Sequence, residues 1–123
     1  MPINQTPTEA QEQCYLFRWM AYNRMKYPEL ALCFHIPNGG SRHRLEAVHL
    51  KEQGVKAGVP DLCLPVARGR YHGLYIELKR QKGGRLSVAQ AEWLRALQAQ
   101  GYRTAVCAGW ESARDTIMEY LRT

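Results

Sequence analysis

The sequence predicts an α/β fold in which helices flank a mixed central sheet of about four strands. Two observations lead to this prediction. Apolar residues recur at helical spacing in four segments, and shorter runs with the apolar character or the alternation of strands lie between them. In chain order the expected elements are helix, strand, helix, hairpin, helix, strand and helix. The length of 123 residues suits one domain, so we expect residues 1–123 to fold as one unit.

The first helix is expected to start at Thr6, with the following proline in the first helical position and Glu9 completing a capping box. It should continue to about Met25, because Pro28 disfavours further helix just before it. Glu9 and Glu12 lie about one turn apart on this helix, so both carboxylates can face the same side.

The next segment is expected to be a buried strand followed by a tight turn. Residues 30–36 form a short apolar run, and Pro37-Asn38-Gly39-Gly40 is a strong turn signal. Asn38 is expected to serve this turn, although a glycine-rich turn can also let a phosphate approach the backbone. A second helix should then span residues 41–54, with Leu45 and Val48 turned inward.

The second half of the chain is expected to begin with a hairpin whose strands span residues 61–66 and 71–79. Ser87 and Gln90 form a capping-box pair, which predicts a helix to about residue 100. A last strand at residues 102–108 and a terminal helix that starts at Glu111 or Ser112 and ends at Leu121 complete the fold.

Composition excludes several classes of protein. No apolar run approaches the roughly 18 residues of a membrane span, and the N-terminus lacks the basic and apolar regions of a signal peptide. The four cysteines are widely spaced, each lies in an apolar setting, and they match neither a zinc knuckle nor a redox motif, so we expect them to be reduced core residues. These features predict a cytoplasmic protein without membrane contact.

The net charge of +6 predicts a polyanionic partner, and its distribution along the chain is uneven. Between Gly40 and Arg85, ten Lys and Arg residues stand against four acidic residues, whereas the rest of the chain holds seven of each sign. The excess positive charge surrounds the site described next, which favours contact with a nucleic-acid backbone over a solvated basic face. The residues expected to contact DNA are Arg42, Arg44, Lys56, Arg68, Arg70, Lys82 and Arg85, with Asn38 at the turn.

Each strand of the expected hairpin carries an acidic residue. Asp61 stands at the start of an apolar run, and strand alternation places Glu77 and Lys79 on one face, with Leu78 on the other. Pairing of the strands lets the two carboxylates and the ammonium converge. Crowded carboxylates repel one another, and a divalent metal is the simplest neutralising group.

The expected metal is Mg²⁺, with Mn²⁺ as a substitute, because Mg²⁺ binds through few carboxylates and keeps open positions. Asp61, Glu77 and the carbonyl oxygen of Leu78 are the expected ligands. Lys79 can orient an attacking water or stabilise negative charge on a phosphate. This chemistry suits phosphodiester hydrolysis.

Together with Ile36-Pro37-Asn38-Gly39-Gly40, Gly54-Val55-Lys56-Ala57-Gly58 and Leu86-Ser87-x-x-Gln90, these motifs resemble the VRR-NUC domain of the PD-(D/E)XK nuclease superfamily. The resemblance extends from Glu9 to the end of the last strand. It implies a restriction-endonuclease-like fold and a nuclease that acts on DNA.

Residue by residue, the resemblance implies that Asp61 and Glu77 are the metal-binding acids, Lys79 the catalytic lysine and Gln90 the glutamine near the site. The capping role of Gln90 is compatible with this one. Glu9, four residues before Gln13, best matches the first-helix acid of such nucleases, and Glu12 is the alternative.

The resemblance also implies a stand-alone enzyme of the phage and bacterial type, similar to Holliday-junction resolvases that act as dimers. The leading hypothesis is therefore a Mg²⁺-dependent, structure-selective DNA endonuclease that acts as a homodimer on a four-way junction. A nuclease for flaps, nicks or plain duplex DNA stays open as an alternative, as does a non-catalytic DNA-binding module.

Two further hypotheses concern residues outside this site. A ββα-metal nuclease is disfavoured because the four histidines show no paired spacing, so they are interpreted as ordinary surface or core residues: His35, His43, His49 and His72. Tyr15, Trp19 and Tyr22 are equally good candidates for the core and for a dimer interface.

Overall fold

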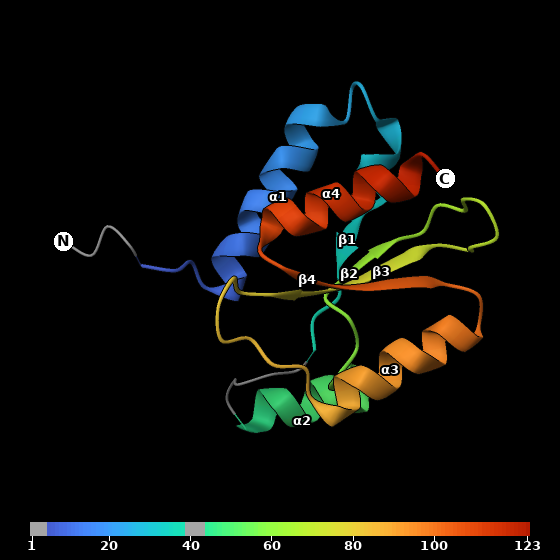
Figure 1. The fold of residues 1–123 in the computed structure, drawn as a ribbon. Helices are drawn as coiled ribbons and strands as arrows, with labels where there is room; N and C mark the ends of the chain where they lie inside the picture. Colours follow the sequence, from blue (N-terminus) through green and yellow to red (C-terminus); the bar gives the residue numbers. More distant parts are fainter. Residues whose placement is uncertain (1–4, 39–43) are drawn as a thin grey trace.

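The computed structural model describes residues 5–38 and 44–123, except for the side chains of Arg44 and Leu45 (Figure 1). Its elements are α1 (Glu9–Asn23), the 3-10 helix η1 (Pro28–Leu32), β1 (Phe34–His35), α2 (Arg44–Glu52), β2 (Leu62–Leu64), β3 (Leu74–Lys79), α3 (Val88–Ala99), β4 (Arg103–Ala108) and α4 (Trp110–Leu121).

The four strands form one mixed sheet in the order β1-β2-β3-β4. The pairs β1–β2 and β2–β3 are antiparallel, whereas β3 and β4 run parallel from Leu74 beside Arg103 to Lys79 beside Ala108. The predicted α/β fold with a mixed four-stranded sheet is thereby confirmed. Within the described ranges, every helix is too short or too polar to cross a membrane.

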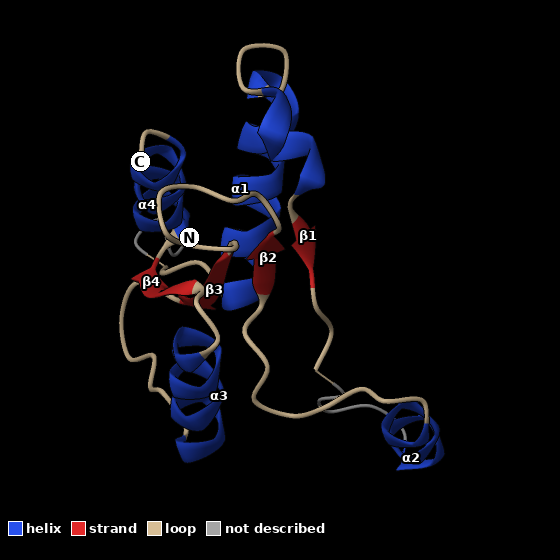
Figure 2. Cartoon of the chain, turned by 90° about the vertical axis from the view of Figure 1, so that its right-hand side faces the viewer, coloured by secondary structure: helices blue, strands red, loops and turns tan. Residues whose placement is uncertain are grey.

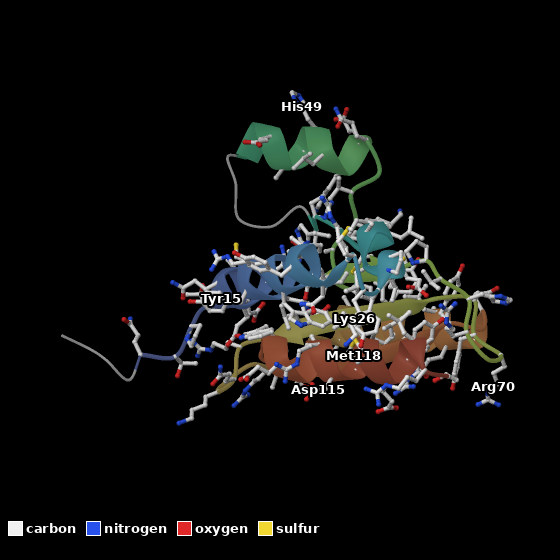
Figure 3. All side chains as sticks on the ribbon, turned by 90° about the horizontal axis from the view of Figure 1, so that it is seen from above. Tyr15, Lys26, His49, Arg70, Asp115 and Met118 are labelled. Carbon is white, nitrogen blue, oxygen red and sulfur yellow. The ribbon has the colours of Figure 1, made fainter. Side chains whose placement is uncertain are left out.

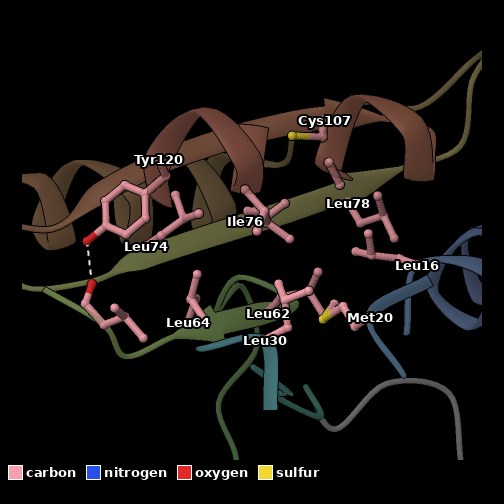
Figure 4. Packing of buried hydrophobic residues seen from close by; sticks show 13 residues of the cluster. Leu16, Met20, Leu30, Leu62, Leu64, Leu74, Ile76, Leu78, Cys107 and Tyr120 are labelled. Atoms are coloured by element: carbon pink, nitrogen blue, oxygen red, sulfur yellow. Dashed lines mark hydrogen bonds between the residues drawn. The ribbon is translucent and has the colours of Figure 1, made fainter. Parts of the chain in front are cut away.

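The helices cover the two faces of the sheet unequally. Helices α1 and α4 pack against one face, and α3 lies against the other (Figures 1 and 2). The main core fills the space under α1 and α4 (Figure 4), with side chains from both helices and from three strands: Leu16, Met20, Leu62, Leu64, Leu74, Ile76, Leu78, Cys107, Ile117 and Tyr120. The Tyr120 hydroxyl, buried in this core, donates to the Val66 carbonyl at 2.6 Å.

Helix α1 begins two residues later than expected. Thr8 is its N-cap, and Gln11 is the capping-box partner, in place of Thr6 and Glu9. Both pairs satisfy the Thr-x-x-Glu/Gln pattern, so the sequence offers two frames for the same motif. The observed frame leaves the Glu9 side chain exposed in the first turn and unused by the cap.

The prediction of a buried strand at residues 30–36 is wrong. Residues Pro28–Leu32 form a 3-10 helix with the proline in its first turn, and only Phe34–His35 pair with the sheet, as an exposed edge strand. A short apolar run does not distinguish a strand from a helical turn, and here Leu30 alone of that helix is buried in the core. The predicted turn at Gly39-Gly40 lies outside the described residues.

Helix α2 stands apart from the rest of the molecule, as Figures 2 and 3 show. Val48, which was expected to face inward, is 50% exposed. Among the described residues, α2 makes no extensive contact with a strand or another helix, and it lies at the end of two long connections (Figure 2). Its expected start at Ser41 lies outside the described residues.

The second half of the chain follows the prediction closely. The hairpin strands pair as expected, although both are shorter than predicted. Ser87 caps α3, and Gln90 completes the capping box. All four cysteines are free thiols, but the prediction that all of them lie in the core is wrong for Cys14, which is exposed; Cys33 is partly buried, and Cys63 and Cys107 are buried.

Candidate active site

Strand β3 carries two charged side chains into the interior on the face that α3 covers. Its alternate residues Leu74, Ile76 and Leu78 enter the main core, so Glu77 and Lys79 point to the opposite face. Glu77 is only 2% exposed and Lys79 only 8%. The Lys79 Nζ lies 3.3 Å from the Glu77 Oε2, so the two charges are paired across one face of the strand.

Gln90, in the first turn of α3, connects both charged groups. Its Nε2 donates to the Glu77 Oε2 at 3.0 Å, and its Oε1 accepts from the Lys79 Nζ at 3.0 Å. The same Oε1 accepts from the Ser87 backbone N–H at 2.8 Å, which is the capping-box bond. The structure therefore brings together the three predicted residues Glu77, Lys79 and Gln90.

Asp61 lies beside them, at the start of β2. Its Oδ2 accepts from the Leu78 backbone N–H at 2.7 Å, and its main-chain carbonyl accepts from the Ile36 N–H at 2.7 Å. In an extended strand the N–H and C=O of one residue point to the same side. The Leu78 carbonyl therefore faces the side on which Asp61 lies, as the predicted metal-ligand set requires.

The chain reaches Asp61 through a loop that packs against the start of α3. Gly58 in this loop has a φ of +87°, and a Cβ there would lie 2.9 Å from the Cβ of Ala89. Only glycine combines this backbone conformation with so close an approach. Asp61 and Gln90 are thus positioned by one contact between their two segments.

The Glu77 carboxylate is held in an unfavourable environment. Burial, followed by the charge of Asp61, raises its pKa from 4.5 to about 7, and Lys79 offsets this only in part. Its Oε1 is buried and has no hydrogen-bond partner in the described part of the chain. Most buried polar atoms are paired, so this oxygen marks a place where a cation would be stabilising.

A pocket of about 190 Å³ opens directly beside Asp61. We call it the reaction pocket, and it is lined by Glu9, Ala10, Gln13, His35, Asp61 and Leu78. Of the two candidates for the first-helix acid, Glu9 lines this pocket. Glu12 is instead fully buried elsewhere and accepts from the Trp110 backbone N–H and from Gln81, each at 3.0 Å.

The donor set suits Mg²⁺ better than a metal that requires a complete protein cage. The described residues hold no group of three or more His, Cys, Asp and Glu side chains arranged around one point. Two carboxylates and one carbonyl oxygen are the hard ligands that Mg²⁺ prefers, and Mg²⁺ usually keeps several waters. Asp61, Glu77 and the Leu78 carbonyl fit such an ion.

The basic residues predicted to contact DNA fall into three groups. Lys82 and Arg85 are exposed on the loop between β3 and α3, next to Lys79, and Lys56 is exposed in the loop before Gly58. Asn38 is exposed just after β1. Arg42 and the side chain of Arg44 lie outside the described residues.

Arg68 and Arg70 are at the opposite end of the hairpin from the site (Figure 3 labels Arg70). The Arg68 guanidinium is engaged within the protein, where it pairs with Glu29 at 2.5 Å and donates to the Leu121 carbonyl at 3.2 Å. The structure therefore does not bring these two arginines to the candidate site.

Two residues of the reaction pocket were missed by sequence reasoning. His35 Nδ1 lies 2.9 Å from the Asp61 carbonyl oxygen, and this nitrogen must carry the proton because a carbonyl only accepts. Gln13 lies one turn after Glu9 on the same side of α1. His35 directly precedes Ile36-Pro37-Asn38, and this adjacency was the one hint in the sequence that it lies near the site. The four histidines show no paired spacing that would have marked His35 as a metal ligand.

Comparison with known proteins identifies a family model and a solved structure that this chain resembles. The family model described as the VRR-NUC domain matches residues 4–111. A solved structure titled "VRR_NUC domain protein" is 32% identical in sequence and superposes with a TM-score of 0.80, over 96% of this chain and 91% of the other. Among curated proteins, none matches this chain.

Proposed function

The chain belongs to the VRR-NUC family, and from this premise we propose that it is a Mg²⁺-dependent, structure-selective DNA endonuclease. Family membership implies a nuclease-type function. The proposal adds the metal, the residues that act and the geometry of the substrate.

One observation carries the proposal, which is the crowding of Asp61 and Glu77 beside the Lys79 ammonium, with Asp61 of these groups also on the wall of the reaction pocket. The pKa of Glu77 is raised to about 7, and the described residues provide no partner for its Oε1. Both features are costly for the isolated protein and favourable for cation binding. Mg²⁺ bound there would polarise the scissile phosphate and lower the pKa of a bound water.

The protein's own groups orient the reaction. The Lys79 ammonium donates to the Gln90 Oε1 at 3.0 Å; in the proposed reaction it would stabilise the negative charge that develops on the phosphate or orient the attacking water. Glu9 adds a carboxylate to the wall of the reaction pocket. Lys82 and Arg85 are exposed beside the site and would contact neighbouring phosphates.

The proposed substrate is a four-way junction cut by a homodimer. Such a junction offers two equivalent strands, and a twofold dimer presents two equivalent sites to them. Flaps, nicks and plain duplex DNA are the alternative substrates, and a non-catalytic DNA-binding module is the alternative from another class. The experiment below separates all of these.

The test is cleavage of end-labelled junction, flap and linear duplex at equal concentration, with Mg²⁺, Mn²⁺ or EDTA. Wild type is compared with Asp61→Ala and Lys79→Ala. Matched controls are Asp115→Ala and Lys26→Ala, which remove the same charges from exposed positions on α4 and just after α1 (Figure 3). DNA binding is measured in parallel by fluorescence anisotropy.

Metal-dependent paired nicks on the junction, lost in Asp61→Ala and Lys79→Ala but retained in both controls, are the expected result. Equal cutting of flap or duplex would overturn the proposed preference for a junction, but the proposed nuclease activity and its site would stand. Binding without any cutting, under either metal, would overturn the enzymatic proposal in favour of the DNA-binding module.

A further inference from the structure

A second pocket continues from the reaction pocket along α1. We call it the flanking pocket; its volume is about 310 Å³, and it is lined by Gln13, Cys14, Phe17 and His35. Gln13 and His35 line both pockets, so the two cavities share a boundary. Helical spacing explains the continuity, because Glu9, Gln13 and Phe17 succeed one another by four residues on one side of α1.

The chemistry changes along this path. The reaction pocket has two carboxylates in its walls, Glu9 and Asp61. The flanking pocket has an aromatic ring, a thiol, an amide and an imidazole, and none of the described residues that line it is Asp, Glu, Lys or Arg. Its volume is at the lower end of the range for sites that hold small organic groups.

DNA has the same alternation, since each charged phosphate is followed by a largely uncharged sugar and base. We propose that the flanking pocket binds the nucleoside next to the scissile phosphate, and that this nucleoside is unpaired. The proposal rests on the nuclease function proposed above. It deepens that function by naming the feature of the substrate that the site selects.

The requirement for an unpaired nucleoside follows from access. A base that enters a side pocket must leave the duplex stack, and this costs a few kcal/mol for a paired base but little for one that is already unpaired. Flaps provide such bases directly, and at a four-way junction the pairs at the crossover, which lack a continuous stack, are the ones that open at least cost. An aromatic wall such as Phe17 is also suited to a base or sugar of any sequence.

Cys14 makes the flanking pocket accessible to experiment. It is the exposed cysteine of the four, whereas Cys63 and Cys107 are buried. Burial raises the pKa of the half-buried Cys33 to about 12 and also raises that of Cys63. Because the thiolate is the reactive form, a maleimide reagent should modify Cys14 first.

The experiment measures the rate of Cys14 modification by N-ethylmaleimide in the full chain, by mass spectrometry, with Ca²⁺ in place of Mg²⁺. The probes are a single-stranded oligonucleotide, a flap and a fully paired duplex, each at a concentration that binds nine-tenths of the protein. A Cys14→Ser variant with Ala99→Cys, at the exposed end of α3, reports protection unrelated to the pocket.

Single strand and flap should each slow the modification of Cys14 about tenfold, because only the free protein reacts, while the duplex should leave it unchanged. The cysteine at position 99 should react at the same rate with every probe. Unslowed modification of Cys14 under saturating single strand and flap would overturn the proposal. Equal protection by the duplex would also overturn it, since the occupant would then not be an unpaired nucleoside.

A second measurement tests occupancy through function. Wild type modified at Cys14 should bind flap DNA more weakly than unmodified wild type. The affinity of the Cys14→Ser variant for the same DNA should be equal before and after treatment with the reagent. Unchanged binding after complete modification would count against the pocket. The two proposals can fail separately. If DNA protects Cys14 but is not cleaved, only the nuclease proposal is rejected. If DNA is cleaved but does not protect Cys14, only the nucleoside-pocket proposal is rejected.

Discussion

Glu12 and Glu77 are both buried carboxylates, 0% and 2% exposed. Glu12 belongs to α1, which packs on one face of the sheet, whereas Glu77 of β3 points to the other face and contacts Gln90 of α3. Both oxygens of Glu12 accept a hydrogen bond, from the Trp110 N–H and from Gln81. Glu77 has two partners on Oε2 and none on Oε1 within the described ranges. Both oxygens of Glu12 are thus satisfied by other parts of the fold, whereas the Oε1 of Glu77 is still able to accept an interaction.

The difference separates structural burial from burial that serves a reaction. Glu12 joins α1 to the first turn of α4, where unpaired N–H groups favour a negative charge. Glu77 is instead crowded by Asp61, and its pKa is raised to about 7. A buried acid with every oxygen paired therefore stabilises this protein, whereas the unpaired Oε1 of Glu77, within the described residues, is the feature on which the proposed metal site rests.

The largest expected effect is on cleavage. Lys79→Ala should lower the rate by about 10²–10³-fold, as loss of a charge-stabilising group commonly does, and Glu77→Gln should lower it at least as much. Glu12→Gln should cut at close to the wild-type rate once its folded fraction is matched. Single-turnover rates on junction or flap DNA provide the measurement, and a Glu12→Gln enzyme as impaired as Glu77→Gln would remove the distinction.

The order reverses for stability without metal. Glu12→Ala should lower the free energy of unfolding by about 2–5 kcal/mol, because two buried donors lose their acceptor. Glu77→Gln should be neutral or stabilising, since it removes one of two crowded charges. Urea unfolding in EDTA measures both, and a destabilised Glu77→Gln would show that the carboxylate is needed by the fold itself.

Divalent cations should stabilise only the protein with an intact site. At a Mg²⁺ or Mn²⁺ concentration of 100 times Kd, wild type and Glu12→Gln should each gain about 2.7 kcal/mol. Glu77→Gln and Asp61→Ala should gain far less. Thermal unfolding with and without EDTA tests this, and an equal gain in all four proteins would place the cation elsewhere.

Stability without metal should also depend on pH in a predictable direction. The folded-state pKa of Glu77 is raised, to about 7, so between about pH 4.5 and 7 the native state binds more protons than the unfolded state. The stabilising contribution is present below pH 4.5 and is lost as the pH rises through 7. The slope should be at most about 1.4 kcal/mol per pH unit, and comparing it with that of Glu77→Gln isolates this residue.

The smallest expected effect concerns DNA contacts. Lys82→Ala and Arg85→Ala should each reduce the salt dependence of DNA binding by about one phosphate contact, a slope change of roughly 0.9. Arg68→Ala should leave that slope unchanged, because its guanidinium pairs with Glu29 at the far end of the hairpin. Affinities measured at several salt concentrations distinguish these cases, and a reduced slope in Arg68→Ala would extend the DNA path over that end.

Local patterns predicted the parts of the structure that depend on near neighbours. The Ser87–Gln90 capping box and the alternation of β3 were both recognisable from the sequence, and they place Gln90 beside Lys79. The first helix illustrates the limit of such patterns, because two overlapping Thr-x-x-Glu/Gln frames were equivalent until Thr8 was found at the N-cap.

Contacts between distant segments were not predictable. Helix α4 has no side-chain cap of its own, and the Trp110 N–H is satisfied by Glu12, 98 residues earlier. That contact also removes Glu12 from the reaction pocket. His35 reaches the pocket because the edge strand β1 pairs with β2. Neither contact follows from a fixed spacing along the sequence, because each joins segments that are distant in the chain.

The Gln90 Oε1 accepts both from the backbone N–H that starts α3 and from the Lys79 ammonium. During synthesis, Asp61, Glu77 and Lys79 leave the ribosome before the segment that forms α3. Until that helix nucleates, the lysine has no acceptor from Gln90, and the arrangement around it is incomplete. The order of synthesis thus completes the contacts of Lys79 only after three of the four strands have been made.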